Sequence, residues 1–343
     1  MMLVKELPLI KMIASYKKLI KSLNENRILY NEKLNKYSSF KVGGCADIYY
    51  KCNSKDELIE AVVASKKYSI PYIVIGGGTN LLISDNGFKG LVIKNESKEI
   101  KIVGIRGVKN HISGFRPKNQ FTVFLEVDSG VTINRLVRFT LDQGLKGIEA
   151  FLGQPGSVGG AVWINAHNLR MLKYVSDAIE SIKIINKYNK LIEVPKSYFQ
   201  FSYDNSIIQS TKEIVVSVIF KFQRSNSEDL WKVANQSLIY RKESQPTGIY
   251  SSGCTFRNIS KVDAIRLTTP EYTCSAGYII ESLGLKGKSI GGAKFSNKHA
   301  NFIVHNGNAN SRDIYSLIQL AKKRAKSELS IDLKEEIVLV GEF

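Results

Sequence analysis

The chain has 343 residues, 43% of them hydrophobic and 23% charged, which is typical of a globular protein with room for two or three domains. Its net charge of +18 comes from scattered lysines without a basic stripe or tail. This pattern favours an anionic small-molecule ligand over specific nucleic-acid binding. The four cysteines lack the spacing of a zinc or iron–sulfur site, so we expect reduced thiols and no metal. No apolar run near the N-terminus matches a signal core or a membrane span, which predicts a cytoplasmic protein with no membrane contact.

The chain order predicts an N-terminal helical extension, a compact β-α-β-β unit, a strand-rich middle and a helix-rich end. In the first part of the chain we expect helices within 3–24, a strand at 46–50, a helix from Asp56 that Pro71 stops, and strands at 72–75 and 91–94. In the middle we expect a helix at 133–143 that Gly144 ends, and strands at 182–185, 190–194 and 215–222. The last part should contain a helix from Ser225, a helix that begins at an Asn310 N-cap with Asp313 at its third position, and a strand at 336–340. We place the domain limits at 1–35, 36–97, 98–225 and 226–343.

The stretch GGGTN, residues 76–80, follows a predicted strand directly. Its glycines leave successive N–H groups without Cβ obstruction, and the Thr79 hydroxyl and Asn80 amide add donors, which suits a pyrophosphate. Leu81 stands where a dinucleotide fingerprint needs its third glycine, and no Lys-Ser/Thr pair follows as in a Walker loop. A glycine-rich hairpin turn is the alternative interpretation.

A second glycine-rich stretch, GQPGSVGGAVWINA, occupies residues 153–166. It offers bare backbone N–H groups to something flat or anionic. A mobile glycine loop is the alternative, but the β-forming residues Val162, Trp163 and Ile164 follow at once and should fix the stretch in a packed element.

Several stretches together, in this order, resemble the UDP-N-acetylenolpyruvoylglucosamine reductases, flavin-dependent enzymes of peptidoglycan synthesis. They are SSFKVGGCAD, VIGGGTNLLISDNGFKG, GIEAFLGQPGSVGGAVWINA, YDNSII, QPTGIYSSGCTFRN, AGYIIESLGLKGKSIGGAKFSNKHANFIVHN and EEIVLVG, within residues 36–341. The resemblance implies an α+β fold, with a two-subdomain FAD-binding module of the vanillyl-alcohol-oxidase type followed by an α/β substrate-binding domain. It also implies an NADPH- and FAD-dependent reduction of the enolpyruvyl double bond of a UDP-sugar, giving UDP-N-acetylmuramate. We expect a monomer.

The same resemblance implies the site residues. The cofactor-binding positions are Gly76, Gly77, Gly78, Thr79, Asn80, Leu81, Gly153, Pro155, Gly156, Ser157, Gly159, Gly160, Ala161 and Asn165. The substrate-binding positions are Tyr203, Asn258, Lys286 and His299. Cys254 matches the acid that protonates the carbanion, a serine or cysteine in the family, and Glu336 matches a catalytic glutamate. A small buried thiol and a solvated carboxylate are the alternative interpretations of these two residues.

Several positions depart from the family pattern, among them Ile259 in place of a proline and the 168–170 segment in place of a glycine, and two of the departures concern the substrate site. Asp204 stands where a Tyr-Arg-x-Ser motif has the arginine that balances the substrate carboxylate, so repulsion of the substrate is expected. Arg224 or Lys242 is a candidate replacement cation. His167 replaces the glycine after Ala166, and it either covers the flavin, donates a hydrogen bond to the substrate or is an exposed loop residue.

Two further functions therefore stay open. One is a homologue that keeps FAD but has lost the reductase reaction and has a binding role, a regulatory role or another substrate. The other is an FAD-dependent oxidase with a different electron donor.

Overall fold

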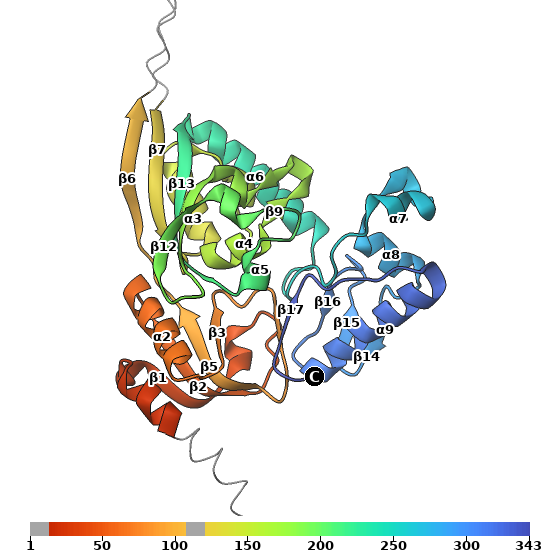
Figure 1. Cartoon of the computed structure of the whole chain (residues 1–343). Helices are drawn as coiled ribbons and strands as arrows, with labels where there is room; N and C mark the ends of the chain where they lie inside the picture. The colour runs from red at the N-terminus through yellow and green to blue at the C-terminus, as the bar shows by residue number, and fades with distance from the viewer. Residues whose placement is uncertain (1–13, 108–120) are drawn as a thin grey trace, which may run out of the picture. The chain divides into compact units, whose positions relative to one another are not determined.

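The computed structural model describes residues 14–107 and 121–343, which divide into two compact units (Figure 1). Unit 1 consists of the described parts of 1–29, 48–76 and 90–239. Unit 2 consists of 30–47, 77–89 and 240–343. Of the predicted N-terminal helical extension, residues 14–21 are helical, and residues 1–13 lie outside the described residues.

A six-stranded sheet forms the larger part of unit 1, in the order β12-β11-β13-β7-β6, with β8 pairing with β13. Its strands are β6 (Ile100–Gly107), β7 (Phe121–Asp128), β8 (Leu145–Lys146), β11 (Ile179–Ile185), β12 (Leu191–Pro195) and β13 (Ile214–Arg224). Alternate residues of β7, Val123, Leu125 and Val127, are buried, as expected for a strand with one covered face. The predicted strands at 182–185, 190–194 and 215–222 are therefore confirmed.

Helices α3 (Ile133–Asp142) and α4 (Val158–Ile164) belong to the same core as this sheet (Figure 1). Helix α3 ends before Gly144, whose φ of +60° stops it, as predicted. The β-forming residues 162–164 are packed as expected, but they lie in a helix. Ser157 caps its first turn, and Asn165 ends it with a φ of +52°. Capping and packing therefore override the strand propensity of these side chains.

A four-stranded sheet, in the order β1-β2-β5-β3, and helix α2 (Lys55–Lys67) correspond to the predicted β-α-β-β unit. Its strands are β1 (Ile28–Lys33), β2 (Cys45–Cys52), β3 (Tyr72–Ile75) and β5 (Phe88–Asn95). Strands β3 and β5 are parallel, and Leu58 and Val62 of α2 pack with Leu91 in one core.

Apart from α6, the described elements that belong neither to the two sheets above nor to the group around α9 described below are short. They are η1 (Glu25–Arg27), η2 (Leu34–Tyr37), η3 (Glu149–Phe151), β9 (His167–Asn168), η4 (Leu169–Met171), β10 (Lys173–Tyr174), η5 (Val175–Ala178), η6 (Lys196–Phe199), α5 (Ile208–Thr211) and α6 (Ser227–Ser244). Leu230 and Ala234 of α6 are buried in the unit 1 core.

Unit 2 is built around helix α9, which lies along β14 and β15 (Figure 1). Its elements are the parallel pair β4 (Leu81–Ile83) and β17 (Val338–Val340), the sheet β14 (Ser289–Ile290), β15 (Ala293–Phe295) and β16 (Ile303–Val304), and the helices α7 (Lys261–Arg266), η7 (Pro270–Tyr272), α8 (Ala276–Ser282) and α9 (Ser311–Leu329). The Asn310 capping box with Asp313 is present as predicted, and Ile314, Leu317 and Ile318 are buried.

Among the helices that the structure describes, none combines the length and the apolar composition needed to cross a membrane.

A second cap joins α9 to a segment distant in sequence. The Asp85 carboxylate accepts hydrogen bonds from the backbone N–H groups of Ser311 and Arg312, at 3.0 and 3.2 Å. The Asp85 N–H donates to the Ser311 hydroxyl at 2.7 Å. A carboxylate here also stabilises the positive end of the helix dipole.

We predict that Asp85→Ala lowers the free energy of unfolding by about 1–3 kcal/mol, because two helical N–H groups lose a charged acceptor. Urea denaturation followed by circular dichroism measures this change. The matched control is Lys323→Ala on the exposed side of α9, which should change stability by less than about 0.5 kcal/mol. Equal stabilities of the two variants would contradict the proposed role of Asp85.

Candidate active site

Gly76 brings the two predicted cofactor stretches into contact within unit 1. It directly follows strand β3, and a Cβ atom built on it would lie 2.0 Å from the Ser157 hydroxyl oxygen. The Gly76 carbonyl accepts a hydrogen bond from the Lys94 amine. Any side chain larger than hydrogen at position 76 would displace Ser157, so the glycine is required by close packing.

The loop after Gly76 presents a run of backbone N–H groups. The N–H groups of residues 77–80 donate to no acceptor within the parts of unit 2 that the structure describes. Gly78 has a φ of +64°, and a Cβ there would lie 1.8 Å from the carbonyl oxygen of Tyr37. The Ser38 hydroxyl beside it is buried and has no hydrogen-bond partner among the described residues. These groups fit an anionic ligand such as a pyrophosphate.

Asn80 and Leu81 have structural contacts in unit 2. The Asn80 amide nitrogen, which we expected to face a pyrophosphate, donates to the Glu336 carbonyl at 2.9 Å. Leu81 begins β4 and pairs with Val338 of β17. The carbonyl of Leu81 also accepts from Ser252 at 3.3 Å.

The second stretch turns sharply before it enters α4. Gly153 and Gly156 have φ values of +83° and +114°, a conformation that only glycine adopts easily. The N–H of Gly153 donates to the Asn134 side chain at 2.7 Å. Gly159 lies so close to Ser129 that an added Cβ would be 3.1 Å from the serine Cβ. The stretch is therefore a fixed turn and helix start, not a mobile loop.

Two amide oxygens in this stretch, those of Gln154 and Asn165, are buried without a protein hydrogen bond in the described part of the chain. Buried polar atoms normally have partners, so these orphans indicate a ligand or solvent donor. Asn165 was predicted from the sequence, and its amide nitrogen donates to the Ser202 carbonyl at 2.9 Å. Gln154 was missed, although its place between Gly153 and Pro155 was a usable signal.

The predicted catalytic residues Cys254 and Glu336 lie on neighbouring segments of unit 2. The Glu336 N–H donates to the carbonyl of Thr255, the residue after Cys254, at 2.8 Å. On its other side Cys254 forms an isolated bridge with Phe302. Both Cys254 and Glu336 are partly exposed, so each can meet a ligand.

Arg241 is a cation that sequence reasoning missed. It lies within electrostatic range of Cys254, and its guanidinium donates to the Gln245 side chain at 2.9 Å. Burial lowers the pKa of Arg241, and negative charge on Cys254 raises it, but a guanidinium stays charged at neutral pH. Arg224, a candidate replacement cation, is exposed at the end of β13 in unit 1. The position of Arg241 just before the QPTG stretch was the available signal.

Three predicted substrate-binding residues of unit 2 have internal contacts. The Asn258 side-chain oxygen accepts from the Ala276 N–H at 3.1 Å. The Lys286 amine pairs with Glu281 at 2.7 Å on the surface. Burial lowers the pKa of His299, and its Nδ1 accepts from the Asn301 N–H at 3.3 Å, which favours a neutral ring.

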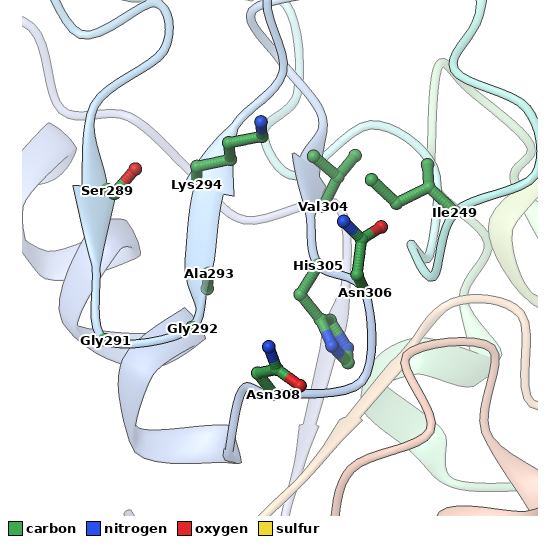
Figure 2. Close-up of a pocket in the computed structure, with 10 residues that line it drawn as sticks. All are labelled: Ile249, Ser289, Gly291, Gly292, Ala293, Lys294, Val304, His305, Asn306 and Asn308. Carbon is green, nitrogen blue, oxygen red and sulfur yellow. The ribbon is translucent and has the colours of Figure 1, made fainter.

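A small pocket of about 150 Å³ opens beside β14–β16 in unit 2 (Figure 2). It is lined by Ile249, Ser289, Gly291, Gly292, Ala293, Lys294, Val304, His305, Asn306 and Asn308. The Nδ1 atom of His305 accepts from Gly307, its Nε2 is bonded to the Phe40 carbonyl, and burial lowers its pKa. This pattern fixes a neutral tautomer with a structural role, and the lining contains neither Cys254 nor Glu336.

The two departures from the family pattern meet in unit 1. The Nδ1 atom of His167 lies 3.2 Å from a carboxylate oxygen of Asp204. The ring of Tyr203, a predicted substrate-binding residue, lies 5.0 Å from the His167 ring. Asp204 is fully buried and its carboxylate faces His167 inside the protein. The repulsion of the substrate that the sequence predicts at this position stays a prediction. His167 is only partly exposed, which also excludes a free loop residue.

Comparisons with known proteins agree with this organisation. A family model for an FAD binding domain matches residues 46–194, and the model for the C-terminal domain of UDP-N-acetylenolpyruvoylglucosamine reductase matches residues 245–340. The reductase of that name from Caldanaerobacter subterraneus is 33% identical, covering 95% of this chain and 97% of its own. The one from Chlamydia felis is 34% identical, covering 90% and 92%.

A crystal structure of the Thermus caldophilus enzyme, UDP-N-acetylenolpyruvylglucosamine reductase, superposes with a TM-score of 0.68. It is 27% identical and covers 92% of this chain and 98% of its own. The prediction of an FAD-binding module followed by a second α/β domain is thereby confirmed. From these matches along nearly its whole length, we conclude that the chain belongs to the UDP-N-acetylenolpyruvoylglucosamine reductase family.

Proposed function

We propose that the protein uses NADPH and FAD to reduce UDP-N-acetylglucosamine enolpyruvate to UDP-N-acetylmuramate, in peptidoglycan precursor synthesis. The observation that carries this proposal is the backbone pairing of the Cys254 and Glu336 segments in unit 2. This pairing places the Cys254 thiol and the Glu336 carboxylate on adjacent segments, and the chain belongs to a reductase family. The net charge of +18 suits an anionic UDP-sugar and NADPH.

FAD supplies the hydride chemistry when bound, so the chain has to bind it, orient it and exclude water. We infer that the N–H groups of 77–80 hold phosphate oxygens, and that the turn at 153–157 and the start of α4 provide a backbone surface for the flavin. The orphaned oxygens of Gln154 and Asn165 support this assignment, because a flavin ring carries N–H donors. The cofactor contacts are Gly76, Gly77, Gly78, Thr79, Asn80, Leu81, Gly153, Pro155, Gly156, Ser157, Gly159, Gly160, Ala161 and Asn165.

The proton at the end of the reaction comes from the protein. We infer that the Cys254 thiol gives it to the carbon that bears the substrate carboxylate, since a thiol releases a proton more readily than a hydroxyl. Arg241 supplies positive charge near this thiol and stabilises the anion that forms on it. Glu336 is the second catalytic side chain, and its backbone is fixed by Asn80 and Thr255.

Substrate binding is assigned to Tyr203, Asn258, Lys286 and His299. Lys286 is the exposed cation of this set, and its partner Glu281 has to release it before it can meet a phosphate. We infer that Asn258 and His299 shape the binding surface, because each side chain accepts a hydrogen bond from a backbone N–H within unit 2. We propose that the enzyme acts as a cytoplasmic monomer.

The contact between Gly76 and Ser157 allows a test of the flavin assignment. Gly76→Ala should lower the flavin content of the purified protein at least tenfold, because the added methyl group collides with the Ser157 hydroxyl 2.0 Å away. The absorbance ratio at the flavin and protein bands measures this. Gly104→Ala in β6 is the matched control, because its Cβ would meet the Phe124 ring at an ordinary 3.5 Å. A Gly76→Ala protein with full flavin content would contradict the assignment.

The role of Cys254 as proton donor can be tested by substitution. Cys254→Ala should slow reoxidation of the reduced flavin by the enolpyruvyl substrate by about 10²–10⁴-fold, because the proton donor is lost. Cys254→Ser should keep much of the rate, since a hydroxyl can also donate. The half-reaction with NADPH should stay unchanged in both variants. Stopped-flow flavin absorbance separates the two half-reactions.

Cys274→Ala is the control for the Cys254 variants, since Cys274 is another partly exposed thiol of unit 2. Full substrate turnover by Cys254→Ala would remove the cysteine from the mechanism. Wild-type protein that holds flavin and accepts electrons from NADPH, but transfers none to the enolpyruvyl substrate, would instead indicate a family member with another substrate or a binding role.

A further inference from the structure

His167 and Asp204 form one structural feature, although they lie in different segments. His167 belongs to strand β9 and is paired with Tyr174 of β10. Asp204 lies in a tight turn, with a φ of +50° and hydrogen bonds between Ser202 and Asn205. The two side chains approach to 3.2 Å between Nδ1 and a carboxylate oxygen.

The carboxylate of Asp204 is buried next to the His167 imidazole. Its side chain is fully buried, and neither carboxylate oxygen accepts a hydrogen bond in the part of the chain that the structure describes. An isolated buried carboxylate is strongly destabilising unless a cation compensates it. The Nδ1 atom of His167 lies at ion-pair distance from this carboxylate, without hydrogen-bond alignment. The contact therefore places the imidazole where its charged form would compensate the buried carboxylate.

The turn that carries Asp204 is anchored to the C-terminal end of α4. The Ser206 hydroxyl donates to the Trp163 carbonyl at 2.6 Å. The Gln209 amide donates both to the same carbonyl at 2.9 Å and to the Asp204 carbonyl at 3.0 Å. Because α4 belongs to the glycine-rich stretch assigned to the flavin, the pair is fixed relative to that stretch.

The other edge of the imidazole is available. The His167 side chain keeps 17% of its surface exposed, whereas the Asp204 side chain keeps none. The Nδ1 atom, which faces Asp204, is buried. The rings of Tyr203 and Tyr174 flank the imidazole, with centroids at 5.0 and 5.9 Å. A charged imidazole with one nitrogen on a buried carboxylate and an outward Nε2–H is a donor for an anion.

We propose that His167 binds the carboxylate of the enolpyruvyl substrate through its Nε2–H, and that Asp204 is a positioning residue that orients the imidazole through Nδ1. This inference rests on the proposed function, which supplies the carboxylate. The pair thereby replaces a single arginine by a buried anion and a partly exposed cation. Among the described residues, Tyr174 faces the imidazole from β10, and Tyr203 and Asp204 face it from the 202–205 turn.

The test is a double-mutant cycle on the flavin-loaded protein, with His167→Gly, Asp204→Arg and the combined variant. Each single change should raise KM for the enolpyruvyl substrate at least tenfold. His167→Gly leaves Asp204 without its cation, and Asp204→Arg places two cations side by side. The combined variant should recover most of the loss, because one arginine then serves as the cation. The half-reaction with NADPH should stay within twofold throughout.

Two shape-conserving variants keep the test valid if the cycle proteins lose flavin. His167→Gln keeps a donor without charge, and Asp204→Asn keeps the shape without charge, and each should raise KM by at least fivefold. Lys173→Ala is the matched control, because it removes an exposed cation from the same hairpin as His167.

Wild-type KM values in both shape-conserving variants would overturn the inference, and so would additive losses in the combined variant. Wild-type protein that is reduced by NADPH but inert toward the enolpyruvyl substrate would overturn the proposed function, and the inference with it. An active wild type with unaffected variants overturns the inference alone.

Discussion

The two glycine-rich stretches assigned to the cofactor depend on one constraint, the close contact between Gly76 and Ser157. The Ser157 side chain has two structural roles. Its hydroxyl caps α4, and the side chain also fills the space next to the end of β3. A side chain at position 76 would push Ser157 away and uncap a helix of only seven residues. Such a short helix has little stability of its own, so its cap and its packing against the sheet decide whether it forms.

The sequence predicted the parts of the fold that local chemistry determines. The Asn310 capping box, the end of α3 at Gly144 and the alternating strands of the middle segment each depend on neighbouring residues. Helix α4 shows the limit of this reasoning. Its β-branched and aromatic residues favour a strand locally, and only the distant contacts of Ser157 and the buried core make the segment helical.

The same limit applies to the site. The ordered motifs located Cys254, Glu336 and the glycine loops, because these residues are defined by the segments that carry them. The electrostatic influence of Cys254 on Arg241 and the approach of His167 to Asp204 could not be predicted, because each depends on tertiary structure that no spacing encodes. Asp204 is the clearest case. Taken alone, a carboxylate in that motif indicates repulsion of an anionic substrate, whereas the structure shows this carboxylate buried beside an imidazole.

An ion pair and a lone arginine differ in how they bind an anion. A lone guanidinium in a dry site has no compensating charge until its ligand arrives, so it attracts the ligand strongly from a distance. The His167–Asp204 pair is close to neutral, so its long-range attraction is weak, and its contribution is a directed hydrogen bond at short range. In a chain with a net charge of +18, long-range attraction for an anionic substrate is already supplied by the whole protein. A compensated pair can therefore replace an arginine, provided that its outward nitrogen is held in place, as the anchored 202–205 turn achieves.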